Sequence, residues 1–474
     1  MVILNIMIKW LATSAAVTFF ICVLFLSLVI QGTSSVISET RKTTLINRIS
    51  GAQIDVLGAF HGFYVLRGHT YFDEAGTASA LSIIESLNAA DKIDLEGALD
   101  YIASTQNTLS GGFGAWIDHF DDTFRGFDLY TTYRVVHALK ENGVLSKINL
   151  TALTGFVLSR YNASIGAFSE LITEANGRQY AVSWFALGFR SWLDQVAYAI
   201  PNVITTFAGI SVLADLDSLD LINVTRTLEF IMSTRAQNGL FKPYPTAHQE
   251  NLPGWSSLLT NPFDVDSYGT GIPYTYAAVS TLKALGRLDT INQSDREKIT
   301  RYILDCQAES GNFYIHKDYE DDESSYTFYA MMTLIDLNTQ SQSEQAIAKV
   351  QKHILQAQNF ETENQWPIPQ PQHQISVSDG NLYGLFRDGG GDPMSDSFRA
   401  VAILEATNAL SLLDQPTPRS FTVLLNSIII SSLATVLVVL VAIAAITVKN
   451  RILARQKQPP IGTPTPSQTI QIWR

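Results

Sequence analysis

The sequence predicts an all-α protein: six repeats of a helical hairpin, flanked by an N-terminal and a C-terminal transmembrane helix. Two observations predict it. A pair of linked helical patterns recurs in register through the middle of the chain, and a long uncharged apolar segment lies near each end. We therefore divide the 474 residues into an apolar segment over 1–30, a linker over 31–50, the repeats over 51–415, a second apolar segment over 422–448 and a tail over 449–474.

The first repeated pattern predicts one helix of each hairpin. A Ser or Thr precedes an aromatic residue, and aliphatic residues follow three and six positions after the aromatic one, which places the apolar side chains on one helical face. Ser or Thr suits the start of a helix. The copies begin at Thr77, Thr132, Thr206, Thr275, Thr327 and Ser397, and the first has Ala78 in the aromatic place.

The second pattern predicts the other helix and the turn after it. Amphipathic stretches lead into Gly-x-Phe, where the glycine is expected to close the helix in a left-handed conformation and the phenylalanine to pack back onto it. These turns lie at 111–113, 166–168, 239–241 and 311–313, and the helix over 350–358 is assigned a degenerate copy at Asn359-Phe360. The loops vary in length while the helices do not, so the loops are expected on one face.

One stretch carries a resemblance to a known family. Gly111-Gly112-Phe113-Gly114, followed by Thr132-Tyr133-Arg134-Val135-Val136-His137-Ala138-Leu139, resembles the repeat of protein prenyltransferase β-subunits and of squalene and terpenoid cyclases. The resemblance implies a six-hairpin α/α toroid, or α6/α6 barrel, in which six inner and six outer helices close around an axial pocket. Such a fold does not determine a function.

The catalytic motifs of those relatives are not reproduced here. Protein prenyltransferases resemble one another in a zinc site of Asp, Cys and His, but the only cysteine outside the apolar ends, Cys306, falls late in a predicted helix, where a small residue suits packing. No cofactor is therefore predicted, and zinc is not expected. Class II terpenoid cyclases use an Asp-x-Asp-Asp-Thr acid. The nearest candidates for a catalytic acid are Asp121, Asp122 and Asp322.

Acidic and aromatic residues near the predicted inner helices provide binding candidates. Carboxylates such as Asp128, just before a helix, cap its N-terminus and meet the positive end of its dipole. A ring of such groups would also surround one mouth of the toroid, and long loops carry tryptophans nearby. The candidates for binding at this mouth are Asp266, Asp392, Asp396, Trp255 and Trp366.

The two apolar segments predict membrane spans. Trp10 to Ile30 and Val423 to Val448 carry no charge, and at about 1.5 Å per residue each is long enough to cross a bilayer. Four Lys and Arg residues between 449 and 457 favour a cytoplasmic tail. The first segment is either an uncleaved signal anchor or a cleaved signal peptide. In both cases residues 31–421 are expected outside the cytoplasm.

The region between these segments is acidic. It holds all 44 Asp and Glu residues but only 26 of the 32 Lys and Arg residues, so nucleic acid is not an expected partner. Four Asn-x-Ser/Thr sequences, at Asn149, Asn162, Asn223 and Asn292, agree with a location outside the cytoplasm, although chance would produce about as many.

Three hypotheses for function remain. The first is an extracytoplasmic binding module whose axial cavity holds a hydrophobic ligand, a glycan or a partner protein. The second is an enzyme of the cyclase or transferase class that acts on an isoprenoid or lipid, and the third is a carbohydrate-active α/α barrel enzyme. A buried Asp with a raised pKa in an aromatic axial pocket would favour the second, and two exposed carboxylates roughly 5 to 10 Å apart would favour the third.

Overall fold

The computed structural model describes most of residues 40–417 and parts of a helix between 429 and 452. Within that range, the residues outside the description are 54–58, 67–68, 73, 115, 120–121, 126–127, 171, 176–177, 182–200, 246–270, 316–323, 359–374, 377–384 and 387–392. Thr40–Gln415 form one compact unit, and Met1–Glu39 with Pro416–Arg474 form another. Among the described residues, no helix combines the length and the apolar character that crossing a membrane requires.

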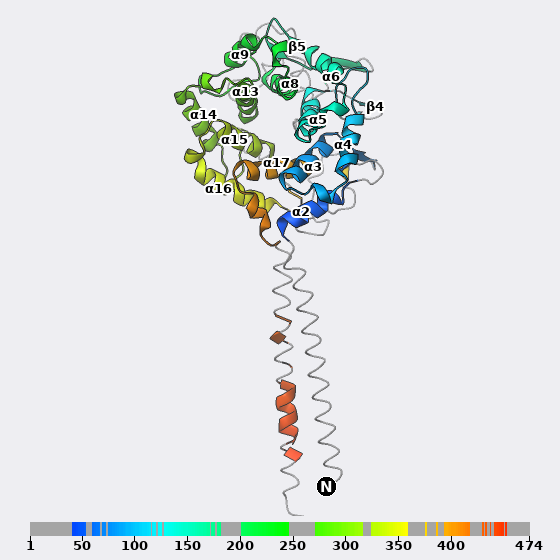
Figure 1. The fold of residues 1–474 in the computed structure, drawn as a ribbon. Coiled ribbons are helices and arrows are strands. Elements are labelled where there is room, and N and C mark those ends of the chain that lie inside the picture. The colour runs from blue at the N-terminus through cyan, green and yellow to red at the C-terminus, as the bar shows by residue number, and fades with distance from the viewer. Residues whose placement is uncertain are drawn as a thin grey trace, which may run out of the picture. The chain divides into compact units, whose positions relative to one another are not determined.

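Six inner helices form a closed ring in the unit Thr40–Gln415 (Figure 1). Each packs against the next in chain order, and the last packs against the first. They are α3 (Glu74–Ser86), α5 (Leu129–Glu141), α8 (Val203–Asp215), α13 (Ile272–Ala284), α15 (Ser324–Asp336) and α17 (Pro393–Ala406). All six copies of the first repeated pattern begin within the first two turns of these helices, as predicted.

Six outer helices surround the inner ring (Figure 1). They are α2 (Arg41–Ser50), α4 (Leu95–Ser104), α6 (Leu150–Leu158), α9 (Val224–Ser233), α14 (Gln293–Asp305) and α16 (Gln340–Ala357). Each outer helix is followed along the chain by an inner one, which makes six hairpins. The six-hairpin α/α toroid is therefore confirmed.

The compact unit begins before residue 51. Residues 41–50, predicted as part of a linker, form α2, whose Leu45 and Ile49 are fully buried. The backbone N–H of Arg41 donates to the carbonyl of Gln415 at 3.0 Å, so the two ends of the unit meet. A sequence signal for this helix exists, because Gly58-Ala59-Phe60 repeats the Gly-x-Phe pattern.

The connections differ between the two faces of the toroid. Inner helices lead into the next outer helices through short 3₁₀ turns or directly, whereas outer helices lead into inner ones through long segments. These long segments contain the described strands, which the sequence did not predict. One sheet has the strand order β2 (His69–Phe72), β1 (His61–Leu66), β9 (Ile375–Ser376). The others are two-stranded: β3 (Trp116–His119) with β4 (Asp122–Arg125), β5 (Tyr161–Asn162) with β6 (Ala167–Phe168), and β7 (Ile172–Ala175) with β8 (Arg178–Ala181). The variable loops therefore share one face, as expected.

One hydrogen bond recurs in all six hairpins and explains both sequence patterns. The backbone N–H of the turn phenylalanine donates to the hydroxyl of the Thr or Ser that opens the inner-helix pattern, at 3.0 to 3.2 Å. The six phenylalanines are the largest fully buried side chains among the described residues: Phe60, Phe113, Phe168, Phe241, Phe313 and Phe386. The Thr or Ser hydroxyl thus links each turn to its inner helix by a hydrogen bond, and it does not cap the N-terminus of that helix.

The turn glycines have the predicted left-handed conformation, but they lie beyond the ends of the outer helices and do not close them. The φ angles of Gly111, Gly166, Gly239 and Gly311 are 85°, 83°, 90° and 109°. The outer helices end several residues earlier, at right-handed C-caps such as Thr105 and Cys306. A left-handed glycine is needed because the turn lies against the backbone of the next outer helix: a Cβ on Gly111 would lie 2.2 Å from the carbonyl of Ala152.

The last hairpin corrects the assignment of Asn359-Phe360. Its turn phenylalanine is Phe386, which forms a β-bridge with Gln358 and donates its N–H to Ser397. Phe360 lies outside the described residues. The assignment failed because 27 residues separate Gln358 from Phe386, far more than in the other turns, so the pattern matched a nearer phenylalanine.

Replacing Thr206 with Val is expected to lower the free energy of unfolding by about 1 to 3 kcal/mol. The substitution keeps the side-chain shape but leaves the buried N–H of Phe168 without its acceptor, 3.1 Å away. Urea unfolding followed by circular dichroism measures the loss. Thr108→Val, at an exposed position of the turn after α4, is the control and should change stability by less than about 0.5 kcal/mol.

Candidate functional site

Aromatic rings line the contacts between neighbouring inner helices. Ring centroids are 5.2 Å apart between Tyr133 and Phe207, 5.4 Å between Phe207 and Tyr276, 5.8 Å between Tyr276 and Phe328, and 6.2 Å between Phe328 and Phe398. These five residues, which we call the aromatic belt, occupy the aromatic place of the first pattern on α5, α8, α13, α15 and α17. Tyr133, Tyr276 and Phe398 keep part of their surface accessible to solvent, so the belt offers a ligand an apolar wall.

Tyrosine hydroxyls add hydrogen-bond donors to this wall. Tyr329 stacks on Tyr276 with centroids 5.0 Å apart, and its hydroxyl is buried beside Tyr130. Burial raises the pKa of Tyr133, Tyr276 and Tyr329 well above the ordinary value, and the neighbouring Tyr130 adds to the effect. The hydroxyls therefore stay protonated and remain donors at any physiological pH.

Arg134 completes the belt where an aromatic residue is missing. Ala78 on α3 takes the aromatic place there. Arg134 on α5 donates to Ser79 on α3 and lies over Phe398 on α17, with its guanidinium carbon 5.2 Å from the ring centroid. No described carboxylate forms an ion pair with Arg134. A partly buried guanidinium without a counter-charge is a donor for an oxygen atom of a ligand.

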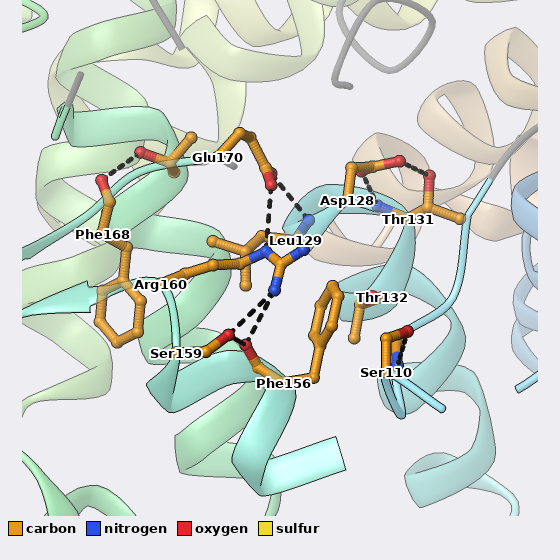
Figure 2. A network of polar contacts seen from close by, with 12 residues as sticks. Ser110, Asp128, Leu129, Thr131, Thr132, Phe156, Ser159, Arg160, Phe168 and Glu170 are labelled. Atoms are coloured by element: carbon orange, nitrogen blue, oxygen red, sulfur yellow. Dashed lines mark hydrogen bonds and ion pairs between the residues drawn. The ribbon is translucent and has the colours of Figure 1, made fainter. Parts of the chain in front are cut away.

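A buried cluster of charges lies at the N-terminus of α5 (Figure 2). Asp128 is the N-cap: its carboxylate accepts the N–H of Thr131 at 2.7 Å and the Thr131 hydroxyl at 2.8 Å. Glu170 accepts the N–H of Leu129 at 2.7 Å. Arg160 donates to Glu170 at 3.4 Å and lies 3.5 Å over the ring of Phe156. The predicted capping role of Asp128 is therefore confirmed.

The cluster contains two carboxylates but only one cation. Burial raises the pKa of Asp128 to about 6, although the hydrogen bonds from Thr131 oppose the shift. Burial, and then the charge of Asp128, raise the pKa of Glu170 to about 8. Near pH 7, Glu170 is therefore largely protonated, and the charges of Asp128 and Arg160 balance each other.

Most of the predicted site residues lie outside the described residues. These are Asp121, Asp266, Asp322, Asp392, Trp255 and Trp366. Asp122 opens strand β4 opposite His119, and its side chain is not described. Asp396 lies in the first turn of α17, is only 2% exposed and forms an ion pair with Arg399 at 3.1 Å. Asp396 is thus buried and paired, and its role in binding stays a prediction.

Cys306 occupies the predicted place at the end of an outer helix. It is the C-cap of α14, is fully buried, and matches the C-caps Thr105 and Thr234 of other repeats. Within the part of the chain that the structure describes, no group of three or more His, Cys, Asp and Glu side chains is arranged to hold a metal ion.

The aromatic belt and Arg134 were not predicted as a site. Their residues were already part of the first pattern, but the pattern was interpreted as apolar packing. A signal was available: at about 100° per residue, the second position after each Thr or Ser lies on the opposite side of the helix, away from the outer layer. Arg134, Tyr329 and Arg399 occupy that position, and polar side chains at this place in an otherwise apolar pattern are a signal for a site.

These features define the chain as a mostly helical toroid whose neighbouring inner helices meet through aromatic side chains. It belongs to the family of the prenyltransferase α/α toroid domain, which matches residues 7–178, 129–253 and 261–362. A comparison with curated proteins finds no match.

Solved structures with a similar fold are distant in sequence. A protein geranylgeranyltransferase-I from Candida albicans, complexed with GGPP, is 15% identical, with a TM-score of 0.44, and the match covers 75% of this chain and 91% of that one. A type II terpene cyclase from Scytonema, in complex with geranylgeranyl dihydroxybenzoate, is 12% identical, with a TM-score of 0.47 and coverage of 82% and 100%. A cellobiose 2-epimerase from Bacillus thermoamylovorans is 13% identical, with a TM-score of 0.46 and coverage of 76% and 96%. Likenesses of this degree carry no information about function.

Proposed function

We propose that this chain is a binding module, tethered to a membrane through its terminal segments, whose toroid lies outside the cytoplasm and holds an apolar ligand that carries an oxygen acceptor. The ligand lies against the aromatic belt, and its oxygen accepts hydrogen bonds from Arg134 and from tyrosine hydroxyls. One observation carries the proposal. The guanidinium of Arg134 lies beside partly accessible aromatic rings, and no described carboxylate forms an ion pair with it.

The chemistry of the inner wall suits such a ligand. Aromatic side chains provide large apolar contact area, and a few placed donors set the orientation of what they bind. The hydroxyls of Tyr133 and Tyr276 donate to no described residue and stay protonated. The toroid as a whole is acidic, so a neutral carbonyl or hydroxyl group suits it better than a multiply charged anion.

Enzymatic alternatives have weaker support. Asp128 is buried with a raised pKa, as a cyclase acid would be, but both of its oxygens are engaged by Thr131. A carbohydrate-active enzyme needs a pair of exposed carboxylates, and Asp396 is buried and paired with Arg399. The described residues therefore favour binding over either kind of catalysis.

Support for the membrane tether comes from the terminal segments. Val423 to Val448 carries no charge over 26 residues, and positive residues follow it. Its described helical positions expose apolar side chains: Leu440 is 56% exposed, Ile443 54% and Ile446 59%. Such a surface is stable in lipid and costly in water.

Calorimetric titration of the detergent-solubilised full chain with 2-naphthol, an aromatic probe with one hydroxyl group, tests the binding site. We expect Arg134→Met, and separately the double change Tyr133→Phe with Tyr276→Phe, to weaken binding about tenfold, which corresponds to roughly 1.4 kcal/mol. Lys352→Gln, at an exposed position of α16, is the matched control. Equal affinity in all four proteins, with unchanged unfolding curves, would contradict the proposal.

A further inference from the structure

Four asparagines on the outer surface begin exposed Asn-x-Ser/Thr sequences, a feature that their role in the fold does not require. Asn149, Asn162, Asn223 and Asn292 open the only Asn-x-Ser/Thr sequences of the whole chain. All four are exposed, and so are the hydroxyl residues two positions later: Thr151, Ser164, Thr225 and Ser294. Each sequence is therefore accessible in the folded protein as an acceptor for an N-linked glycan.

In each case the side-chain oxygen is used and the nitrogen is not. Asn149, Asn223 and Asn292 are the N-caps of α6, α9 and α14, and their Oδ1 atoms accept the backbone N–H three residues later at 2.9 to 3.0 Å. Asn162 Oδ1 accepts the N–H groups of Ser164 and Ile165. Their Nδ2 atoms donate to no described residue. A substituent on Nδ2 would leave the oxygen, and with it the helix cap, in place.

The four asparagines gather on one half of the outer wall. The outer helices follow one another around the ring as α2, α4, α6, α9, α14 and α16, so α9 lies opposite α2 (Figure 1). Tyr161 donates its hydroxyl to the carbonyl of Asn223 at 3.3 Å, which places Asn162 close to the start of α9. The helices α2, α4 and α16 have Thr40, Asp94 and Thr339 at their N-cap positions and carry no such sequence. Since the chain enters and leaves the unit beside α2, the asparagines lie on the half farthest from those ends.

We propose that Asn149, Asn162, Asn223 and Asn292 are N-glycosylated and that the glycans cover the half of the outer wall centred on α9. The donor is an oligosaccharide linked to a polyprenyl diphosphate. The N–C bond forms between Nδ2 and the first sugar, the C–O bond from that sugar to the diphosphate breaks, Nδ2 releases one proton, and the lipid diphosphate leaves. The inference rests on the extracytoplasmic location proposed above, because the transfer takes place on that side of the membrane.

Expression of the full chain in a eukaryotic cell with an N-glycosylating secretory pathway tests the inference. Digestion with peptide-N-glycosidase F is expected to shift the wild-type band downwards on a gel, and each of the single changes Asn149→Asp, Asn162→Asp, Asn223→Asp and Asn292→Asp removes one step of that shift. Aspartate keeps the cap, as Asp94 does for α4 by accepting the N–H of Gly97 at 2.9 Å. The fourfold variant should show no shift and an unchanged unfolding curve.

Two controls separate this inference from the proposed location. Asp94→Asn with Glu96→Thr places a new acceptor at the equivalent cap of α4 and is expected to add one step. Protease protection of the toroid in sealed microsomes reports its location directly. A protected toroid in which the native asparagines stay unmodified overturns the glycosylation inference alone, and a toroid that external protease digests overturns both proposals.

Discussion

Replacing Gly111 with Ala is expected to lower the free energy of unfolding by about 2 to 5 kcal/mol, from the strain of a positive φ together with overpacking. The φ angle of Gly111 is 85°, and the added Cβ would lie 2.2 Å from the carbonyl carbon and oxygen of Ala152. Those atoms belong to the backbone of α6, so relief requires moving an outer helix. Urea unfolding of the full chain, followed by circular dichroism, measures the effect.

Two other glycines separate the clash from the backbone strain. Gly143 also has a positive φ, 68°, but a Cβ there would meet nothing within 4 Å, so Gly143→Ala should cost only about 1 to 2 kcal/mol. Gly155 lies within α6 with equally open space, and Gly155→Ala should stabilise the protein by about 0.5 to 1 kcal/mol. If Gly111→Ala and Gly143→Ala lower the free energy of unfolding by the same amount, the close approach of Gly111 to Ala152 does not contribute to the loss of stability.

Six-fold repetition explains why the helices were predictable. The hydroxyl of Thr132 accepts the N–H of Phe113, and the same pair of residue types recurs in every hairpin because each hairpin solves the same packing problem. A pattern that repeats is visible in one sequence without relatives. The pattern fails where the spacing changes, as between Gln358 and Phe386.

The candidate site was less predictable because it depends on contacts between repeats. Arg134 on α5 reaches Phe398 on α17, which is 264 positions away in the sequence, and no local pattern marks that contact. Glu170 lies beside the N-terminus of α5 only because the long connection after α6 returns there. Such contacts between distant residues form only when the ring closes. The sequence pattern predicts the helices, but it does not predict which side chains of different helices contact one another.

Replacing Arg160 with Met is expected to lower the free energy of unfolding by about 3 to 5 kcal/mol at pH 7, because it leaves the buried, ionised carboxylate of Asp128 without its counter-charge. Arg160 and Asp128 are 7% and 3% exposed, so water does not compensate for the loss. The guanidinium also donates to the carbonyl of Phe156 at 3.0 Å. An unfolding curve equal to that of the wild type would show that the cluster is not buried in solution.

The pH dependence of stability follows from the raised pKa of Glu170, about 8 in the folded protein against 4.5 in the unfolded chain. The folded state binds the extra proton between these values, so this contribution to stability is complete below pH 4.5 and is lost as the pH rises through about 8. A change of one pH unit in this window corresponds to about 1.4 kcal/mol. We therefore expect the wild type to lose about 2 to 3 kcal/mol between pH 6 and pH 9.

Glu170→Gln isolates that contribution, because the amide keeps the shape and the acceptor oxygen for the N–H of Leu129 but does not ionise. Asp128 and Arg160 then stay balanced above the pKa of Asp128, about 6, whereas ionised Glu170 adds a second buried negative charge in the wild type above pH 8. The variant should already exceed the wild type in stability by about 2 kcal/mol at pH 6, and this excess should grow by a further amount of about 2 to 3 kcal/mol by pH 9. Unfolding measured at pH 6, 7, 8 and 9 decides the matter: parallel losses in both proteins would place the titrating group elsewhere in the chain.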